Sequence, residues 1–421
     1  MASIGIVGAG VSALHLGLLL RQHDVPVTIY AEKSAEDVAV GRLLNTVAHH
    51  HVMLERERRL GIEHWDTAQL GYDGHLHYFG FPEPLQFRGE FEARSRAVDY
   101  RIYLPQLMSD FEAVGGVVEV GAVGVESVPT LADRHDLLVV AAGRGPLAAM
   151  FPVRADRRVE HPWRNLTAAL YRGIAPNEPN DVTLGVAPGD GEIIEIPILS
   201  FDGLVNALLI EAVPGGALDV ISDARYDEDP AGFEKLVLEL LRVHLPPVFA
   251  RIDTGAFGVT RPQDVLQGAI TPCMREDYLA MPNGTFALAM GDAHVVMDPV
   301  VAQGANAASY SAEVVGNAIL AGGPFDEGFC QRVAAERAHF LDSAYHWVNS
   351  MLGPPSPQLV ALTVGMAMDK SVCDDFTDNF AHPDRQWANL ATIEQTRAYL
   401  AGKGHDLDAL LAAAGPPPGD H

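Results

Sequence analysis

The sequence has 421 residues, of which 48% are hydrophobic and 20% charged, a composition typical of a globular protein with a large core. At roughly 100–200 residues per domain, this length predicts two or three domains and excludes a single small module. The 29 basic and 55 acidic side chains give a formal net charge of −26, which disfavours binding to nucleic acid or to an anionic membrane surface.

Cysteine content and apolar runs narrow the class of protein further. Cys273, Cys330 and Cys373 are too far apart for a disulfide framework or a metal site, which favours a reducing, cytoplasmic setting. No run approaches the ~18 apolar residues of a spanning helix, and no basic leader precedes the first apolar run. We therefore expect a cytoplasmic enzyme without a membrane segment or a secretory signal.

The first 32 residues predict a dinucleotide-binding unit. A strand over residues 4–7, a glycine-rich turn, an apolar helix and a second strand over residues 25–30 follow one another in that order. In the turn, Gly8 permits the tight bend, Gly10 lets a pyrophosphate approach the backbone, and Ala13 lets the helix pack closely on the strand. This order is more specific than the glycine pattern alone.

Two element ends in this unit offer groups to the nucleotide. The helix begins near Val11 and Ser12, where free N–H groups and the positive end of the helix dipole attract phosphate. Glu32 ends the second strand, at the place where an acid binds the ribose hydroxyls of adenosine. An acid at this position favours FAD or NAD over NADP.

Later strands are predicted to form two sheets. Residues 117–120 and 136–142 predict strands that rejoin the first sheet, with a helix over residues 98–113 before them. Strand-like runs separated by turn clusters over residues 166–213 predict neighbouring antiparallel strands of a second sheet domain. Short strands are also predicted within residues 70–87.

A second glycine-rich stretch, residues 143–148, also follows a predicted strand. It lacks the helix, strand and acid that would complete a nicotinamide nucleotide site, so we interpret it as a turn beside the adenosine half of the cofactor. Helices are predicted over residues 229–245 and 306–320, and from about residue 326 the chain is predicted to be mostly helical.

Residues 290–310, MGDAHVVMDPVVAQGANAASY, carry a second flavin signature. Gly291 and Asp292 end a predicted strand, and the Asp292 carboxylate can accept hydrogen bonds from a ribityl hydroxyl. Pro299 and Gly304 shape a loop before a helix that begins near Asn306. The positive end of that helix would stabilise reduced flavin, which is an anion at neutral pH. The two signatures together predict FAD.

Long stretches of the chain resemble the epoxidase component of two-component styrene monooxygenases, a flavin-dependent family that also contains indole monooxygenases. The matching stretches are SIGIVGAG…LHLGLLLRQHDV, RLLNTVAHH, SRAVDYRIYLP, GEIIEIPILSF, DPVVAQGAN and DDFTDNF…PDRQW, which extend from about Ser3 to Trp387. The resemblance implies an α/β fold, with a Rossmann-like FAD-binding domain of the aromatic hydroxylase type, an inserted β-sheet substrate domain and a helical C-terminal region.

The resemblance also implies how the domains follow one another along the chain. We expect an FAD-binding domain of residues 1–50, 91–160 and 278–345 and a substrate-binding sheet domain of residues 51–90 and 161–277. The C-terminal helical region would cover residues 346–421, with a flexible tail from about residue 415.

A two-component reaction is the chemistry that the resemblance implies. A separate NADH-dependent flavin reductase supplies reduced FAD, which diffuses to the oxygenase and reacts with O2 to form a C4a-hydroperoxyflavin that epoxidises styrene to (S)-styrene oxide. Because the alkene supplies its own π electrons, no catalytic acid, base, nucleophile or metal of the protein is required, and the protein must orient the alkene and exclude water. A homodimer is expected, with no nucleic-acid or membrane partner.

Six positions, here called the fingerprint, separate styrene-type from indole-type members of the family. Those of this chain are all of the styrene type: Asn45, Val47, His49, Tyr72, His75 and Ser95. We therefore expect a styrene-type aromatic alkene as substrate and indole as a side substrate. An indole monooxygenase, a single-component NAD(P)H-dependent hydroxylase and a non-catalytic flavin carrier stay open as alternatives.

The expected site residues come from the glycine-rich turns, the loop RLLNTV, the fingerprint and a few apolar positions. The expected substrate and flavin pocket comprises Arg42, Leu43, Leu44, Asn45, Val47, His49, Tyr72, His75, Ser95, Leu208, Pro299 and Val301. The expected FAD contacts are Gly8, Gly10, Val11, Ser12, Ala13, Glu32, Arg42, Gly291, Asp292, Pro299, Gly304, Ala305 and Asn306.

Other charged and polar runs are given structural interpretations. The consecutive histidines at residues 49–51 would point to different faces, so no metal site is expected. Arg96 and Arg101 are interpreted as structural, and Arg94 is open to flavin phosphates or to a structural carboxylate. The acidic stretches SDARYDEDP and VCDDFTDNF are interpreted as solvated surface.

Overall fold

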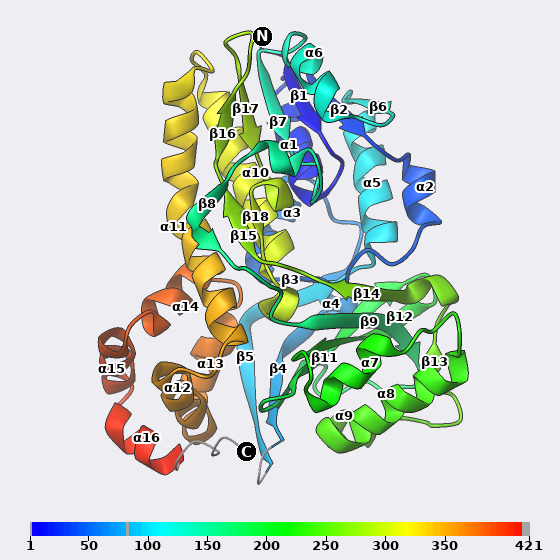
Figure 1. The fold of residues 1–421 in the computed structure, drawn as a ribbon, viewed down its shortest axis with the longest axis vertical. Coiled ribbons are helices and arrows are strands. Elements are labelled where there is room, and N and C mark those ends of the chain that lie inside the picture. The colour runs from blue at the N-terminus through cyan, green and yellow to red at the C-terminus, as the bar shows by residue number, and fades with distance from the viewer. Residues whose placement is uncertain (1, 81–83, 415–421) are drawn as a thin grey trace. The chain divides into compact units, whose positions relative to one another are not determined.

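The computed structural model describes residues 2–80 and 84–414. The chain forms two compact units, each assembled from three segments (Figure 1). Unit 1 comprises Met1–Trp65, Val98–Pro162 and Thr271–Tyr345, and unit 2 comprises Asp66–Ala97, Trp163–Ile270 and His346–His421. The C-terminal helices therefore group with the second sheet rather than forming a region of their own. The tail predicted to be flexible, from residue 415, lies outside the described residues.

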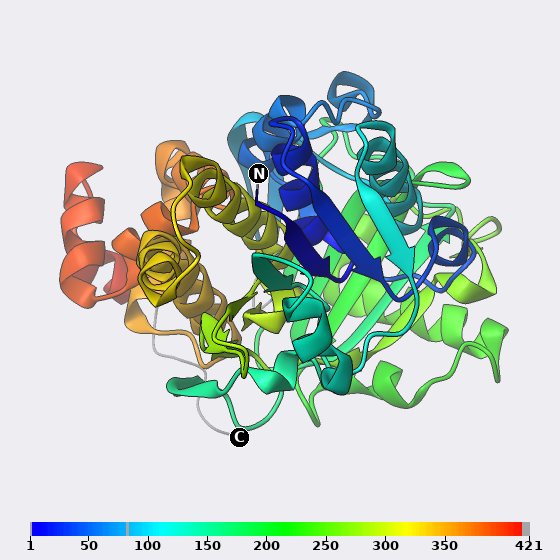
Figure 2. The ribbon, with the colours of Figure 1, turned by 90° about the horizontal axis from the view of Figure 1, so that it is seen from above.

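Unit 1 is built on a sheet with the strand order β16-β17-β7-β1-β2-β6. The strands are β1 (Ile4–Val7), β2 (Val27–Ala31), β6 (Val117–Val120), β7 (Leu137–Val140), β16 (Tyr278–Ala280) and β17 (Phe286–Ala289). All neighbours in this sheet are parallel except β16 and β17. Figure 2 shows β1 and β2 side by side in dark blue. The prediction that residues 117–120 and 136–142 rejoin the first sheet is confirmed.

The central strands of this sheet are short and buried, which is typical of parallel sheets. β1 and β7 are buried along their whole length, as expected for strands that are covered on both faces. Leu138 and Val140 pack against Leu131 of α6 (Val128–Ala132). α1 (Val11–Arg21) packs against β1 and β2, and also contacts α5 (Tyr100–Ala113) and α10 (Gln303–Ala321).

Shorter elements complete unit 1. They are α2 (Ala35–Ala39), β3 (Ala48–His49), α3 (His51–Arg59), η1 (Val125–Ser127), η2 (Ala148–Met150), η5 (Gly291–Ala293), η6 (Pro299–Val301) and most of α11 (Glu327–Leu352). A small antiparallel sheet contains β8 (Val153–Arg158), β15 (Cys273–Arg275) and β18 (Val295–Val296).

Unit 2 is built on a mixed sheet with the strand order β13-β9-β12-β11-β10-β4-β5, and β14 also pairs with β9. Its strands are β4 (Tyr72–Phe79), β5 (Leu85–Ala97), β9 (Asn165–Arg172), β10 (Val182–Ala187), β11 (Gly191–Ser200), β12 (Gly203–Ala212), β13 (Gly258–Val259) and β14 (Val265–Ala269). The run β9, β12, β11, β10 is antiparallel, which confirms the prediction for residues 166–213. β10 pairs with β4 in parallel, and β5 pairs with β4 antiparallel.

Helices cover one face of this sheet. α8 (Pro230–His244) turns its buried residues Phe233, Val237 and Leu241 onto Leu208 and Ile210 of β12, with the spacing of an amphipathic helix. The flanking helices are η3 (Ala217–Asp219), α7 (Val220–Asp223) and α9 (Pro246–Phe249).

The remaining helices of unit 2 are short or C-terminal. They are α4 (Thr67–Leu70), η4 (Pro262–Asp264), α12 (Pro357–Met368), α13 (Lys370–Asp378), α14 (Pro383–Leu390), α15 (Ile393–Gly402) and α16 (Leu407–Ala414). Among the helices in residues 2–80 and 84–414, none has the length and apolar character needed to cross a membrane. All three cysteines are buried and free.

Candidate active site

The first glycine-rich turn has one closed side and one open side. Gly8 has a φ of +112°, and a Cβ built there would lie 2.3 Å from the carbonyl oxygen of Ala141, so the turn needs glycine. A Cβ on Gly10 would meet no atom within 4 Å. Gly10 is also the N-cap of α1, with no side chain capping the helix. This end of α1 therefore presents free N–H groups beside open space, as phosphate binding requires.

The second signature contains a loop that begins with Gly291 and Asp292, here called the GD loop, and this loop lies close to the start of α1. Gly291 has a φ of +60°, and a Cβ on it would lie 2.7 Å from Oγ of Ser12 in the first turn of α1. Ala13, one residue further on, is fully buried. Glu32 is exposed directly after the last residue of β2. The two predicted flavin signatures thus meet within unit 1.

The turn at residues 143–148 faces the GD loop. Gly143 and Gly145 have φ values of +73° and +145°, and only a short 3-10 turn follows at Ala148–Met150. This agrees with the interpretation of the stretch as a turn. Arg144 brings its Nε to 3.8 Å from Oδ2 of Asp292, a pair that is half-exposed.

A buried ion pair between Arg337 and Asp277 supports the strand that leads into the GD loop. Arg337 of α11 is fully buried and donates from Nε to Oδ1 of Asp277 at 2.9 Å and from Nη1 to the carbonyl of Ala289 at 2.8 Å. Nε2 of His294 lies 3.3 Å from the same Asp277 oxygen. Burial raises the pKa of Asp277, but His294 and Arg337 outweigh it and hold that pKa well below its usual range. The motif pattern gave no signal for this support.

The second flavin helix begins earlier than predicted. α10 starts at Gln303 rather than near residue 306, because Ala302 in the left-handed region (φ +53°) turns the chain into the helix. The loop before it is fixed by Asp298, which accepts a hydrogen bond from the backbone N–H of Val300 at 3.1 Å. No side chain caps α10, and a Cβ on Gly304 would meet nothing within 4 Å.

Asn306 fastens this helix to the segment that ends the loop RLLNTV. Its Nδ2 donates to the carbonyls of Ala48 at 2.9 Å and Ala302 at 2.7 Å, and its Oδ1 accepts from the N–H of His50 at 3.0 Å. The amide predicted to contact FAD therefore bonds to the protein's own backbone, and its observed part is to position the loop.

The residues of the loop itself have different environments. Arg42 and Leu44 are exposed, Leu43 is buried, and Val47 is half-buried. Oδ1 of Asn45 is buried without a hydrogen-bond partner among the described residues. His49 is fully buried, with Nδ1 2.8 Å from Oε1 of Glu57 and Nε2 3.0 Å from the hydroxyl of Tyr100.

The other half of the fingerprint lies in unit 2. The register pairs Tyr72 with Ser95, and the next pair is Gly74 with Glu90, so β5 carries extra residues between them. This bulge contains Phe91, whose ring centroid lies 6.1 Å from that of Tyr72 and 4.7 Å from that of His75. A bulge that re-aims a side chain is common beside functional sites.

The Tyr72 and Ser95 hydroxyls are fully buried and have no hydrogen-bond partner among the described residues. Burial raises the pKa of Tyr72, so its hydroxyl stays protonated and can donate. The His75 ring, which contacts Phe91, also contacts Phe380, and the centroids of the His75 and Phe380 rings are 4.4 Å apart. Phe91 and Phe380 were missed because neither carries a motif, and only the bulge and the C-terminal helices bring them here.

The register places Leu208 away from His75. Leu208, Glu195 and Thr183 are aligned on neighbouring strands on the face covered by α8. The residues beside Leu208 on β12, Ala207 and Leu209, lie on the opposite face, which His75 shares. Pro299 is half-buried and Val301 buried in the loop before α10.

The interpretation of VCDDFTDNF as solvated surface is wrong. This run forms α13, which packs on β5 with Cys373, Phe376 and Thr377 buried. Asp374 and Asp378 accept hydrogen bonds from the N–H groups of Glu90 and Glu92, each at 2.8 Å. The carboxylates therefore satisfy the free N–H groups of a strand edge, which periodicity cannot reveal.

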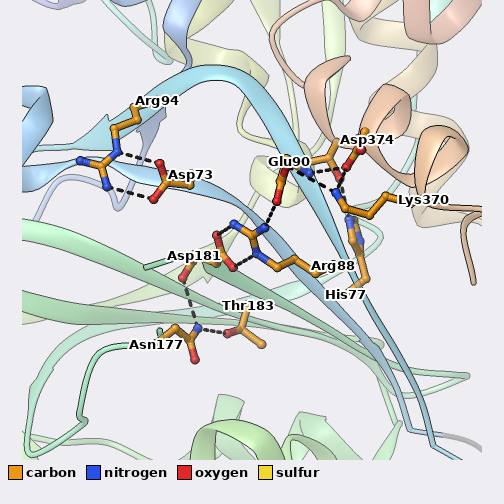
Figure 3. A network of polar contacts seen from close by, with 11 residues as sticks. Asp73, His77, Arg88, Glu90, Arg94, Asn177, Asp181, Thr183, Lys370 and Asp374 are labelled. Carbon is orange, nitrogen blue, oxygen red and sulfur yellow. Dashed lines mark hydrogen bonds and ion pairs between the residues drawn. The ribbon is translucent and has the colours of Figure 1, made fainter. Parts of the chain in front are cut away.

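Ion pairs tie the strands of this region together (Figure 3). Arg94 makes a two-pronged contact with Asp73, at 2.7 and 2.9 Å, and Arg88 makes one with Asp181. Arg94 therefore serves a structural carboxylate. In unit 1, Arg101 pairs with Asp99 at 2.6 Å, both fully buried, as the structural interpretation predicted.

The residues present in unit 1 fit FAD. Two uncapped helix ends, glycines whose missing side chains leave open space, and an acid at the end of β2 match the phosphates, the flavin ring and the ribose in turn. The buried Asn45 Oδ1, which has no hydrogen-bond partner within residues 2–80 and 84–414, offers an acceptor for an arriving N–H group.

Known proteins are similar to this chain in sequence. Residues 143–251 match the family model described as the styrene monooxygenase A putative substrate binding domain. The chain is 40% identical over 397 residues to "Styrene monooxygenase StyA" of Pseudomonas fluorescens, covering 93% of this chain and 96% of that protein.

Solved structures share the fold at low identity. The flavin-dependent brominase Bmp2 aligns with a TM-score of 0.61 at 12% identity, covering 99% of this chain and 94% of that chain. PqsL, a probable FAD-dependent monooxygenase from Pseudomonas aeruginosa, aligns with a TM-score of 0.62 at 14% identity, covering 83% of this chain and 95% of that chain. The chain thus shares its fold with FAD-dependent hydroxylases and halogenases, which confirms the prediction of an aromatic-hydroxylase-type fold.

Proposed function

This chain belongs to the styrene monooxygenase family, and from that premise we propose that it is the oxygenase of a two-component system that converts styrene to (S)-styrene oxide. It is an FAD-dependent monooxygenase. A separate NADH-dependent flavin reductase supplies the reduced FAD, and the reaction takes place in the cytoplasm. Bound reduced FAD would activate O2, so that one oxygen atom of O2 goes to the alkene, the other leaves as water, and FAD is reoxidised.

Unit 1 has the task of holding the cofactor. The open side of Gly10 and the uncapped end of α1 would hold the pyrophosphate, and Glu32 would hold the adenosine ribose. The start of α10 would stabilise the negative charge of the reduced ring. Asn306 holds the loop that carries Asn45 and Val47 at a fixed place relative to that helix start.

Unit 2 has the task of orienting the alkene. The rings of His75, Phe91 and Phe380 meet edge to face and provide an apolar wall for a flat aromatic ring. An alkene offers no hydrogen-bonding group, but the atom added to it is an oxygen. We infer that the Tyr72 and Ser95 hydroxyls, which are buried without partners among the described residues, donate to such an oxygen. This pair is the observation that carries the proposal.

A single turnover without any reductase tests the proposal. FAD is reduced chemically under anaerobic conditions, mixed with the protein, and then mixed with aerated buffer that contains styrene or indole. Product is measured by chiral chromatography, and oxidised FAD with NADH serves as the parallel control.

The expected result is (S)-styrene oxide from pre-reduced FAD and no product from NADH. Product from NADH alone would identify a single-component hydroxylase instead. Faster turnover of indole than of styrene would overturn the substrate drawn from the fingerprint. Peroxide released in place of both products would contradict the monooxygenase chemistry of this chain.

A further inference from the structure

A chain of hydrogen bonds runs through the interior of unit 1. It links Ser309, His15, Tyr103, Glu57, His49 and Tyr100, none of which is more than 5% exposed. The distances in that order are 3.1, 2.8, 2.8, 2.8 and 3.0 Å. The members come from α10, α1, α5, α3 and β3, so the chain joins both flavin signatures to the loop RLLNTV.

On the His15 side of this hydrogen-bond network, each hydrogen bond can have only one donor and one acceptor. Tyr103 donates its hydroxyl proton to Oε1 of Glu57, so Nε2 of His15 must donate to the Tyr103 oxygen. Burial lowers the pKa of His15 to about 4, against the charge of Glu57, while His49 and Arg56 lower it further. His15 is therefore neutral at pH 7, and its Nδ1 accepts from Ser309.

On the side of His49 two arrangements are possible. Nδ1 of His49 donates to Glu57, so Nε2 of a neutral ring accepts the hydroxyl proton of Tyr100. If His49 takes up a proton, Nε2 becomes a donor to the Tyr100 oxygen. The hydroxyl hydrogen of Tyr100 is then free to turn away from His49. One proton thus decides whether Tyr100 offers a lone pair or a hydrogen to its other neighbours.

The His49 end of this hydrogen-bond chain is tied to the start of α10, the helix end that is expected to face FAD. Asn306 binds Ala48 and His50, the residues on either side of His49, and so fixes His49 to the start of α10. Burial raises the pKa of Tyr100 well above its usual value, and the charges of Glu57 and Asp292 act in the same direction. Tyr100 therefore stays protonated, and the carboxylate of the GD loop is near enough to act on it.

We propose that Glu57 and His49 are positioning residues for Tyr100, and that this carboxylate–imidazole–phenol relay takes up one proton and thereby turns Tyr100 from an acceptor into a donor toward the FAD site. The proton comes from water and returns to water when the relay resets, so only N–H and O–H bonds change. A carboxylate that fixes the tautomer and orientation of an imidazole is a familiar device for controlling a hydroxyl. This inference rests on the proposed function, because oxygen transfer from FAD requires a controlled proton.

Histidine NMR on the protein without FAD tests the relay directly. We expect the His49 imidazole, assigned by its loss in His49→Asn, to carry its proton on Nδ1 in the wild type. Glu57→Gln should change the tautomer of this ring, because the amide no longer requires a proton on Nδ1. Glu55→Gln, on the same helix but 55% exposed at its side chain, is the matched control and should leave the ring unchanged. An unchanged His49 signal in Glu57→Gln would overturn the relay.

A pH profile separates proton control from simple support of the fold. Epoxide formed per reduced FAD is measured from pH 6 to 9, with hydrogen peroxide as the remainder. Glu57→Gln and Tyr100→Phe should lower this yield about tenfold or more and flatten its dependence on pH. A lower yield with the wild-type profile would mean a structural role only. If the wild type itself forms no epoxide, the proposed function fails, and the NMR result still decides on the relay.

Discussion

His49 in unit 1 and the Tyr72–Ser95 pair in unit 2 belong to the same fingerprint and are equally buried, but their polar groups are treated in opposite ways. Both ring nitrogens of His49 have partners within a continuous network. The Tyr72 and Ser95 hydroxyls have none among the described residues. A buried polar group without a partner costs stability, so a protein keeps one where a ligand will supply the missing bond.

This difference indicates that residues of the same fingerprint have two different roles. The satisfied network of unit 1 fixes the position of a loop before any ligand arrives. The Tyr72 and Ser95 side chains of unit 2 are positioned by the β4–β5 register and by the bulge that contains Phe91. The Arg94–Asp73 ion pair lies next to Tyr72 in the sequence and supports the same position. Substitutions in the two places should therefore change stability with opposite signs.

The largest effect is expected at the centre of the network. Glu57→Leu removes the carboxylate that accepts from both His49 and Tyr103, and we expect the free energy of unfolding to fall by about 3–5 kcal/mol. Urea unfolding followed by tryptophan fluorescence measures it. Glu55→Leu, on the exposed side of α3, should change stability by about 0.5 kcal/mol or less. Equal effects of the two variants would show that the network adds nothing.

A similar comparison can be made within the first glycine-rich turn, where a Cβ would clash at Gly8 but not at Gly10. Gly8→Ala forces a Cβ onto the Ala141 carbonyl at a positive φ, and we expect a loss of about 2–4 kcal/mol. Gly10→Ala has an allowed φ of −84° and open space, so the fold should keep its stability while FAD binds more weakly. Thermal unfolding and FAD fluorescence titration separate the two. Equal FAD affinity in Gly10→Ala and the wild type would argue against phosphate binding there.

Acid should weaken both units through buried neutral histidines. Burial lowers the pKa of His15 in unit 1 to about 4 and that of His77 in unit 2 to about 3, whereas an unfolded histidine titrates near 6.5. The unfolded chain therefore binds more protons below pH 6.5, and stability falls as the pH drops from about 6.5 toward 4. We expect a loss of roughly 1–3 kcal/mol for each ring.

Unfolding measured at pH 7, 6, 5 and 4 checks this expectation. His15→Gln and His77→Gln should each have a shallower dependence on pH than the wild type, because the group that gains a proton on unfolding is gone. Curves parallel to that of the wild type would contradict the assignment of these rings as neutral.

The smallest effect on stability should have the opposite sign. Tyr72→Phe removes a buried hydroxyl that has no hydrogen-bond partner in the described part of the chain, so we expect the protein to be unchanged or more stable by about 1 kcal/mol. Denaturant midpoints measure this difference, and Tyr103→Phe, which removes a partnered hydroxyl of the network, is the matched control that should destabilise. A clear loss of stability in Tyr72→Phe would mean that its hydroxyl has a structural partner.

The backbone framework was predictable because it depends on local patterns. The runs at β1, β2 and β7 and the two glycine-rich turns carry their own signals of period, spacing and turn chemistry. The antiparallel run from β9 to β12 was predicted in the same way. The start of α10 was not, because it depends on Ala302 adopting a left-handed conformation.

The contacts between distant segments could not be predicted. Glu57 lies in the charged run ERERR and looks like a surface residue, but its partners His49 and Tyr103 come from other elements. Asn306 matched an FAD motif and serves the backbone, while the acids of α13 looked solvated and cap a strand. His49 and Tyr103 lie 8 and 46 residues from Glu57, Ala48 lies 258 residues from Asn306, and Glu90 lies 284 residues from Asp374. Local periodicity carries no information on such pairs.

The most direct test of the account is the epoxide yield of the Tyr72→Phe, Ser95→Ala double variant in a single turnover with chemically reduced FAD. The account predicts a folded protein at least as stable as the wild type, with a yield lowered about tenfold or more and hydrogen peroxide making up the difference. A wild-type yield from this variant would contradict the claim that the two unpartnered hydroxyls serve the reacting ligand.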